Sequence, residues 1–356
     1  MKVSAPGRIC LFGEHQDYLG LDVIASAISL RFYIEATPRE DNIFFLSMPD
    51  INKEEQFLPS NHLTYTNSRD YLKAVVNVLK RECGIEFKKG FNFKFTSEIP
   101  INAGASSSSV MLVAWTKLLL ELFEHPWKDV PEKIAYIAYK AEVVEFKESG
   151  GMMDHFTSAI GGTVHIETKY DPVKIEKFNF VKKGFVLGDS LQPKDTVGIL
   201  KTVKQRALDS VKFIKKIVPD FSFERYTFED IKNELVKIPE EYRKILKGNL
   251  INHELTRKAI ELFRTGKIED RILGEMLYTH HDQLRDNIGI STPKIDKMIE
   301  ESIRAGALGG KINGSGGGGT MFVYAPGKEE KVAEAIERAG GKAYIISIDT
   351  GPILTH

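Results

Sequence analysis

The sequence has few cysteines, no net charge and no long apolar run. Its 356 residues include two cysteines, Cys10 and Cys83, which have neither the spacing of metal ligands nor that of a disulfide framework. So little cysteine is typical of a protein from a reducing compartment. The longest apolar stretch, residues 110–123, is short and is interrupted by Lys117, so it predicts a buried helix rather than a membrane span.

Positive and negative charges are balanced along the chain. Lys and Arg total 49, as do Asp and Glu, which gives a formal net charge of zero. This balance excludes binding to nucleic acid or to an acidic membrane through net charge, although a few local groups can still hold a small anion. The first residues contain no apolar signal segment. We therefore expect a cytoplasmic protein with small-molecule partners, a monomer or a small homo-oligomer.

The length and composition suit a globular protein with two domains. Hydrophobic residues make up 42% of the chain and charged residues 28%, which is ordinary for a protein with a packed core. Strand-like and helix-like patterns are mixed along the chain, which predicts an α+β fold. We place an N-terminal domain at residues 1–180 and a C-terminal domain at residues 181–356.

Hydrophobic periodicity predicts the main elements. We expect a hairpin from residues 31–37 and 43–46. Other strands are predicted at residues 91–95, 164–166, 185–187, 321–324 and 343–348. Helices are predicted at residues 70–83, 109–124, 130–146 and 328–339, and residues 195–305 are expected to be mostly helical.

A first group of polar residues surrounds an apolar strand near the N-terminus. Pro6-Gly7-Arg8 precedes this strand and Gly13-Glu14-His15-Gln16-Asp17-Tyr18 follows it. The carboxylates of Glu14 and Asp17 can accept hydrogen bonds from hydroxyl groups with directional geometry, which suits a polyol. Arg8 can hold a carboxylate or a phosphate. The alternative is a solvated turn at the end of a strand.

Two loops are rich in small residues. Residues 100–109, which end in four serines, precede the apolar helix, whose N-terminal N–H groups and dipole can bind a phosphate. A serine there can also reach magnesium. The loop is not a Walker loop, because no Gly-Lys-Ser/Thr closes it; the alternative is a serine N-cap on a structural helix. The second loop, residues 309–319, leads directly into a strand, so we interpret it as folding against a ligand rather than as a flexible linker.

An acidic group follows the third predicted helix. Glu142 and Glu145 are expected on one face of that helix, and Asp154 follows Gly150-Gly151-Met152-Met153 at a bend. A carboxylate at such a bend could orient or deprotonate a hydroxyl nucleophile. For Glu145 and Glu148 we favour a solvated helix face.

Taken together, these segments resemble the signature motifs of the GHMP kinases, in the family's order, over about residues 1–350. Residues 7–18 look like the galactokinase signature, residues 100–109 like the phosphate loop Pro-x-Gly-x-Gly-Leu-Ser-Ser-Ser-Ala, and residues 313–319 like the third, glycine-rich loop. Residues 150–155 are similar to the family's Cys-Gly-Ile-Met-Asp-Gln, and residues 70–73 and 281–296 also resemble galactokinases. The family fold joins an N-terminal domain like domain 2 of ribosomal protein S5 to a ferredoxin-like C-terminal domain, with the active site between them.

The resemblance implies an ATP-dependent sugar kinase that uses Mg2+ and transfers the γ-phosphate to a sugar hydroxyl, with the anomeric hydroxyl of galactose or a related hexose as the expected acceptor. Asp154 would face the acceptor hydroxyl, and Arg8 would keep Asp154 ionised and help to neutralise the transferring phosphoryl group. Magnesium would be held by Ser108 and Glu142. The remaining residues would bind the substrates: Glu14, His15, Asp17 and Gly151 the sugar, and Gly104, Ala105, Ser106, Ser107, Ser108, Gly314 and Gly316 the nucleotide.

The sequence departs from the family pattern at several positions. Asn102, Ser109, Asn313 and His155 stand where the family has glycine, alanine, threonine and glutamine. The best match to the galactokinase Tyr-x-x-Arg segment, Val203-Lys204-Gln205-Arg206, lacks the tyrosine that faces the sugar. The alternatives are a kinase for another polyol (a uronic acid, a heptose phosphate, an amino sugar or an inositol), for which His15 or His155 could meet a charge, and a non-catalytic sugar and ATP sensor. Whether Asp154 is a base or an electrostatic anchor is also open.

Overall fold

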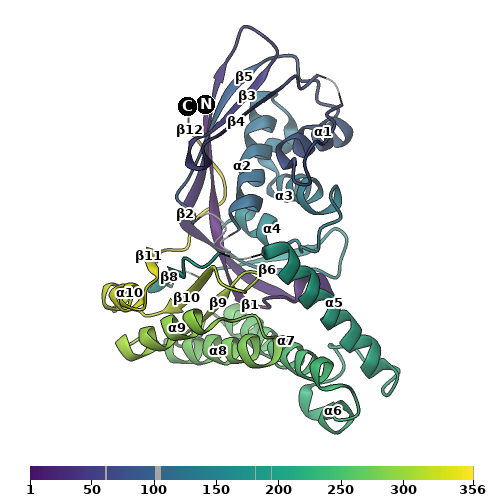
Figure 1. The fold of residues 1–356 in the computed structure, drawn as a ribbon, viewed down its shortest axis with the longest axis vertical. Coiled ribbons are helices and arrows are strands. Elements are labelled where there is room, and N and C mark those ends of the chain that lie inside the picture. Colours follow the sequence, from purple (N-terminus) through teal and green to yellow (C-terminus); the bar gives the residue numbers. More distant parts are fainter. Residues whose placement is uncertain (61, 101–105, 181, 194, 356) are drawn as a thin grey trace.

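The computed structural model describes residues 1–60, 62–100, 106–180, 182–193 and 195–355. In this part of the chain, two β-sheets lie one beyond the other along the long axis of the molecule, each with helices packed on it (Figure 1). The two ends of the described chain meet on the first sheet, where the last strand pairs with the first. This mixture of sheets and helices confirms the predicted α+β class.

The first sheet has the strand order β12-β1-β2-β5-β3-β4, and β6 and β7 branch from β2. Helices α1 to α4 lie together against it (Figure 1). Its strands are β1 (Lys2–Phe12), β2 (Val23–Pro38), β3 (Phe44–Met48), β4 (Lys53–Phe57), β5 (Phe91–Ser97), β6 (Thr163–Glu167), β7 (Lys174–Phe178) and β12 (Ile353–Thr355). The helices are α1 (Tyr71–Cys83), α2 (Ser107–Leu122), α3 (Pro131–Tyr139) and α4 (Met153–Ile160).

The second sheet has the order β11-β8-β10-β9, and α5 and α6 extend beside it as an arm (Figure 1). Its strands are β8 (Phe185–Asp189), β9 (Gly309–Asn313), β10 (Thr320–Tyr324) and β11 (Lys342–Ile346). The helices of this part are α5 (Thr196–Lys215), α6 (Phe228–Leu235), α7 (Glu240–Thr265), α8 (Asp270–Asp282), α9 (Pro293–Ala305) and α10 (Glu329–Arg338). Short helical turns are η1 (Asp17–Leu19), η2 (Pro49–Ile51), η3 (Pro126–Asp129), η4 (Lys140–Val144) and η5 (Gln283–Ile288).

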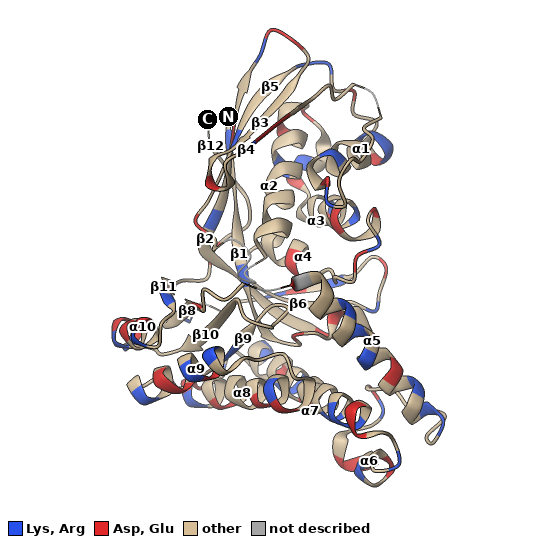
Figure 2. Ribbon diagram, viewed as in Figure 1, with Lys and Arg blue, Asp and Glu red and all other residues tan. Residues whose placement is uncertain are grey.

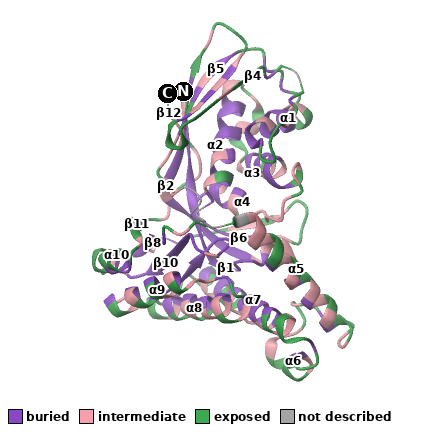
Figure 3. Cartoon of the chain, viewed as in Figure 1, coloured by how far each residue is buried: buried purple, intermediate pink, exposed green. Residues whose placement is uncertain are grey.

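Burial follows the sequence pattern closely in the first sheet. β5 alternates, with Phe91, Phe93 and Phe95 buried, and α1 is buried on all sides over residues 74–79 before it ends at the left-handed Gly84. Strands β1 and β2 are buried along most of their length, whereas the helices expose their outer faces (Figure 3). The site described below lies where the buried end of β1 reaches the second sheet.

The predicted hairpin of residues 31–37 and 43–46 is wrong. Both segments are strands, but β5 lies between β2 and β3, antiparallel to the former and parallel to the latter. Alternation of apolar residues specifies which face of a strand is buried, but it does not specify which strand lies alongside. A short connection suggested a partner that the fold does not use.

The surface is mixed in charge. Along α5 to α10, lysines and arginines alternate with acidic residues (Figure 2), as expected from the zero net charge. Among the described residues, no helix is both long enough and apolar enough to cross a membrane.

Candidate active site

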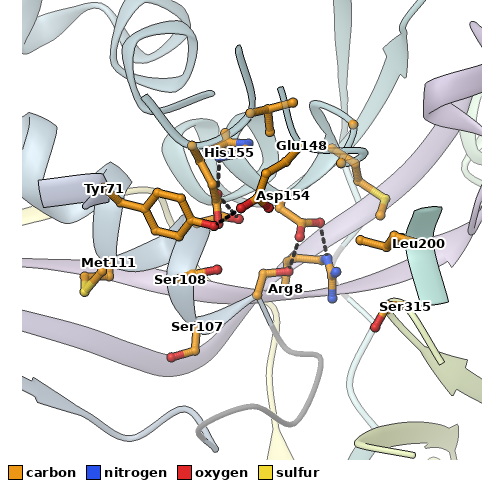
Figure 4. Close-up of a pocket in the computed structure, with 18 of the residues that line it drawn as sticks. Arg8, Tyr71, Ser107, Ser108, Met111, Glu148, Asp154, His155, Leu200 and Ser315 are labelled. Atoms are coloured by element: carbon orange, nitrogen blue, oxygen red, sulfur yellow. Dashed lines mark hydrogen bonds and ion pairs between the residues drawn. The ribbon is translucent and has the colours of Figure 1, made fainter. Parts of the chain in front are cut away.

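A cavity of about 340 Å³ brings residues of all four predicted clusters together. It lies between the end of β1, the start of α2 and the start of α4, and the glycine-rich loop before β10 closes one side (Figure 4). The predicted site residues that line it are Arg8, Glu14, His15, Asp17, Ser106, Ser107, Ser108, Glu142, Gly151, Asp154 and Gly314. Gly104 and Ala105 lie outside the described residues, and Gly316 is not among the residues that line the cavity.

Asp154 and Arg8 form an ion pair at the centre of this cavity. The Nε of Arg8 donates to Oδ1 of Asp154 at 2.7 Å, and the hydroxyl of Ser106 donates to Oδ2 at 2.5 Å (Figure 4). Arg8 is buried in β1, whereas 26% of the Asp154 side chain remains exposed to the cavity. Burial alone raises the pKa of Asp154, but the charge and hydrogen bond of Arg8 and the hydroxyl of Ser106 together lower it by more. The net pKa therefore lies below its ordinary value. Asp154 is therefore an ionised acceptor that faces the cavity.

The start of α2 is shaped for an anion. Ser106 is the N-cap residue, yet its side chain does not cap the helix; instead it donates to Asp154. Its backbone is left-handed, with φ of 63°. An ordinary serine cap would accept from the helix N–H groups, so the expected alternative of a purely structural cap does not hold here. The first turn of an α-helix has N–H groups without a partner inside the helix, and Ser107 and Ser108 of this turn line the cavity wall.

Glu142 lies on a wide helical turn. η4 continues α3 as a π-helix, and the N–H of Glu145 bonds to the carbonyl of Lys140, five residues earlier, at 2.9 Å. Such turns change the register of the side chains. Glu142 is therefore buried beside the cavity, while Glu145 pairs with Arg81 at the surface, and the expectation that the two share one face is wrong.

The carboxyl group of Glu142 has close hydrogen-bond donors. Its Oε2 accepts from Ser109 at 2.7 Å and contacts Nε2 of His155 at 2.6 Å. Burial raises the pKa of Glu142, but His155 and the two serines Ser109 and Ser108 lower it more, so the net pKa lies below its usual value. His155 is only 1% exposed and points at this carboxylate. It is thus not available as the basic residue for a charged substrate that we had considered.

The loop after β1 forms the other end of the cavity. Oε2 of Glu14 accepts from Nζ of Lys311 at 2.9 Å and from the N–H of Gly314 at 3.0 Å. The ring of His15 lies between the hydroxyl of Tyr18, at 2.9 Å, and the carbonyl of Ser315, at 3.1 Å. Glu14 and His15 are thereby fixed against the glycine-rich loop.

Asp17 is the carboxylate with the most strongly perturbed pKa in this loop. It accepts from the N–H of Tyr18 at 2.9 Å and from that of Met153 at 3.4 Å. Burial and the nearby Asp154 carboxylate raise the pKa of Asp17 to about 6, although these two hydrogen bonds act in the opposite direction. Gly151 passes directly against Asp17, because a Cβ at Gly151 would lie 1.7 Å from Oδ2. The glycine is needed for this close approach.

The glycine-rich loop before β10 packs against a neighbouring segment as well as lining the cavity. Gly314 and Ser315 line the cavity, but a Cβ at Gly316 would lie 2.5 Å from Cβ of Ile290, and Gly317 donates to the carbonyl of Ile290 at 2.7 Å. Both glycines have positive φ angles. Close packing against a neighbouring segment therefore explains part of the glycine content that we had assigned to a ligand.

Several cavity residues were missed in the sequence. The hydroxyl of Tyr71 donates to Glu148, and both line the wall (Figure 4), so Glu148 is not the solvated helix residue that we expected. Leu200 of α5 lines the cavity, while Val203, our match for the family tyrosine, packs in the core of the second sheet. Lys311 was also missed; it does not line the cavity but contacts Glu14, and a charge inside a buried strand is a signal that the sequence did contain. Tyr71 lies in the segment 70–73 that resembles galactokinases, although no role was assigned to it, whereas Glu148 and Leu200 lie in ordinary helix or turn patterns that carry no such signal.

Models of known protein families match three segments of this sequence. The matched families are described as "GHMP kinases N terminal domain" over residues 70–162, "GHMP kinases C terminal" over residues 259–344 and "Galactokinase galactose-binding signature" over residues 1–38. A mevalonate kinase of Thermococcus sibiricus is 28% identical over 354 residues, covering 97% of this chain and 95% of the relative. A galactokinase of Mannheimia succiniciproducens is also 28% identical, over 348 residues, covering 94% and 87%.

The fold has counterparts among solved structures. A crystal structure of Lactococcus lactis galactokinase, complexed with galactose, has a TM-score of 0.84 at 22% identity and covers 99% of this chain and 94% of the other. At that identity the likeness concerns the fold, and it confirms the two-part α+β architecture expected from the sequence motifs. With two family domains and the signature segment matched in order, the chain belongs to the GHMP kinase family.

Proposed function

We propose that the protein transfers the γ-phosphoryl group of ATP to a hydroxyl of a neutral hexose, with the anomeric hydroxyl of galactose or a related hexose as the first candidate. One observation carries this proposal. The polyol-binding residues of the segment that matches the galactose-binding signature, the Arg8–Asp154 pair and the serine-rich start of α2 all line one cavity.

In the proposed reaction, Asp154 accepts a hydrogen bond from the attacking hydroxyl. The new P–O bond forms to that oxygen, the bond between the β- and γ-phosphates breaks, ADP leaves and the hydroxyl proton is released. A carboxylate whose pKa is held low is a weak proton acceptor, so orientation and charge fit Asp154 better than complete proton abstraction. Arg8, bonded to Asp154 through Nε, provides positive charge for the transferring group.

The nucleotide is proposed to bind along the start of α2. Ser106, Ser107 and Ser108 lie at the end where the helix dipole favours a phosphate, and Gly314 lies across the cavity. Beyond them the wall becomes apolar, through Phe32, Met48, Ile51, Phe95 and Met111, which suits the flat surface of a base.

The donor set fits a magnesium ion that arrives with ATP. Mg2+ prefers oxygen ligands and commonly takes one or two carboxylates together with substrate phosphates. Glu142 supplies an ionised carboxylate and Ser108 an exposed hydroxyl on the cavity side. Among the described residues, no cluster of three or more His, Cys, Asp or Glu could hold a metal by itself, which agrees with an ion shared with the nucleotide. When bound, the ion would neutralise charge on the phosphates.

The acceptor end favours a neutral polyol. Three carboxylates, Glu14, Asp17 and Asp154, line it. Lys311 is bonded to Glu14 and Arg8 to Asp154, so these cations already balance carboxylates rather than await an anionic acceptor. A substrate carboxylate or phosphate placed here would be repelled. Because some of the relatives are mevalonate kinases, mevalonate is the second candidate acceptor, although it carries a carboxylate.

The proposal is tested by ADP release with Mg-ATP against a panel of acceptors. The panel contains galactose, glucose, mannose, galactosamine, N-acetylgalactosamine, galacturonate, glucuronate, a heptose phosphate, myo-inositol and mevalonate. Turnover on a neutral hexose alone supports the proposal. Turnover on mevalonate or a uronic acid in place of hexoses would overturn the neutral acceptor, and sugar binding without any ADP release would favour a sensor.

A further inference from the structure

The carboxylate of Glu142 receives two buried side-chain donors on one oxygen. Ser109, at the start of α2, donates to Oε2 at 2.7 Å. Nε2 of His155, which is on α4 and is labelled in Figure 4, lies 2.6 Å from the same atom. Ser109 is 5% exposed and His155 is 1% exposed. Two separate helices therefore converge on a single oxygen of a third segment.

The chemistry of the contact fixes the direction of both bonds. The oxygens of a carboxylate carry no hydrogen, so Oε2 of Glu142 accepts both bonds. Nε2 of His155 must then carry a hydrogen and donate, and the imidazole ring is held on its other side by an edge contact with Tyr139 at 5.7 Å between ring centres. Two donors and a packed ring leave the carboxylate little rotational freedom.

Both donors stand at positions where this sequence departs from the family motifs. The phosphate-loop motif has alanine where this chain has Ser109, and the motif around Asp154 has glutamine where it has His155. The two positions are 46 residues apart in the chain, yet they meet at one atom. The two departures therefore form a single unit in space.

We propose that Ser109 and His155 act together as positioning residues, which hold Oε2 of Glu142 so that the rest of its carboxylate is presented to magnesium bound with the nucleotide. This inference rests on the proposed function, because it takes Glu142 as the magnesium ligand. Neither residue touches the sugar end of the cavity in this scheme. Groups that orient a metal ligand commonly change metal affinity by about 10- to 100-fold when they are removed.

The test measures binding rather than turnover. Affinity for the non-hydrolysable analogue AMPPNP is determined by calorimetry with Mg2+ and with EDTA, for the wild type and for Ser109→Ala, His155→Leu and His155→Gln. We expect Ser109→Ala and His155→Leu to lose about 10-fold or more of the Mg2+-dependent gain in affinity, with little change in EDTA. His155→Gln retains a donor and should recover most of the gain.

Ser158→Ala is the matched control. Ser158 lies on α4, one turn after His155, it is fully buried, and its hydroxyl has no hydrogen-bond partner among the described residues. This variant should keep the whole Mg2+-dependent gain. Thermal unfolding identifies any variant that does not fold, and the His155→Gln and His155→Leu pair still decides the question if Ser109→Ala fails.

The double variant Ser109→Ala/His155→Leu shows whether the residues act together. Because both bonds act on one oxygen, the loss should differ clearly from the product of the single losses. An unchanged Mg2+-dependent gain in folded single variants would overturn the inference, as would equal losses with Mg2+ and with EDTA. Either result would leave the acceptor assignment intact, since no sugar takes part in the measurement.

Discussion

At the scale of single residues, Asp154 is exposed to the cavity, and its negative charge is stabilised by Arg8 and Ser106. Replacing it with asparagine keeps the size of the side chain and removes the charge that, in our proposal, faces the acceptor hydroxyl. We expect Asp154→Asn to lower kcat by about 10³-fold or more, within the range of losses for a group that acts on the reacting atoms. Nucleotide affinity should change little. Steady-state rates on the sugar identified by the panel, together with AMPPNP calorimetry, check both parts; near-normal turnover would remove Asp154 from the reaction.

The pKa of Asp17 predicts a pH dependence of sugar binding. Burial and the Asp154 carboxylate raise this pKa to about 6, so Asp17 is ionised above pH 6 and becomes protonated as the pH falls through that value. If the ionised form accepts the sugar hydroxyls, sugar affinity should weaken by up to about tenfold per pH unit below 6. Calorimetry with sugar alone avoids the titration of ATP. Asp17→Asn should bind weakly at every pH, and a wild-type step that survives in this variant would assign the step to another group.

Two adjacent glycines offer a matched pair of substitutions. A Cβ at Gly151 would lie 1.7 Å from Oδ2 of Asp17, whereas a Cβ at Gly150 would meet only Val143, at an ordinary 3.5 Å. We expect Gly151→Ala to displace Asp17 and to raise the sugar KM by about tenfold or more, since a small misplacement in a site can cost that much or more. Gly150→Ala should behave like the wild type. Equal effects of the two substitutions would argue against a positioning role for Gly151.

The residues that could be predicted from the sequence are those in motifs of unusual composition. Arg8, Glu14, Asp17 and Asp154 lie among glycines and apolar strand residues, and this contrast marked them. Glu148 was misjudged, because one glutamate in a Lys- and Glu-rich stretch carries no sign of which way its turn faces. The partner of such a side chain is set by tertiary packing, here by Tyr71, which is 77 residues away in the chain.

At the scale of elements, Lys311 connects β9 of the second sheet to the loop after β1, which we propose binds the sugar and call the sugar loop. This lysine is fully buried and donates to the carbonyl of Cys10 at 2.8 Å and to Glu14 at 2.9 Å. Lys311→Met keeps the length of the side chain but leaves the buried Glu14 carboxylate without its cation. We expect a loss of about 3 kcal/mol in the free energy of unfolding and a clear rise in the sugar KM.

A second buried lysine provides the control for that substitution. Lys117 of α2 is 9% exposed and pairs with Glu121, outside the residues that line the cavity. Lys117→Met should lower the thermal midpoint and leave the sugar KM unchanged. If the two variants change stability and KM in the same proportion, Lys311 has no particular connection with the sugar loop.

Elements with a strong period were predictable, and their neighbours were not. The helix expected at residues 70–83 is α1 at Tyr71–Cys83, and the strand expected at 91–95 is β5 at Phe91–Ser97. The insertion of β5 between β2 and β3 depends on long-range pairing that local alternation does not encode. The π-turn η4 was invisible for a related reason, because its sequence is compatible with continued α-helix and only the packing around Glu142 distinguishes the two.

At the scale of the whole molecule, the chain passes from the second sheet back to the first before it ends. After β11, residues 347–352 lead to β12, which pairs with β1. Arg31 holds this return: its Nη1 donates to Asp349 at 2.6 Å, and its Nη2 donates to the carbonyl of Gly351 at 2.9 Å. The same guanidinium donates to the hydroxyl of Ser4 at 2.9 Å. One buried side chain thus ties the end of the chain to β1 and β2.

Removing this connection should loosen the return without reaching the cavity. Arg31→Ala leaves the Asp349 carboxylate and the carbonyls of Ser4, Thr350 and Gly351 without this donor. We expect the free energy of unfolding to fall by about 3 kcal/mol, because breaking a buried pair costs far more than breaking an exposed one. Arg39→Ala is the matched control, since Arg39 makes two bonds to Asp41 at the surface and its loss should matter much less. Thermal unfolding and limited proteolysis of residues 347–355 measure the effect. Because Arg31 does not line the cavity, kcat at a temperature where both variants are folded should stay close to that of the wild type. A large loss of turnover in folded Arg31→Ala would instead mean that the position of the C-terminal segment is transmitted to the active site through β1, the strand that carries Arg8.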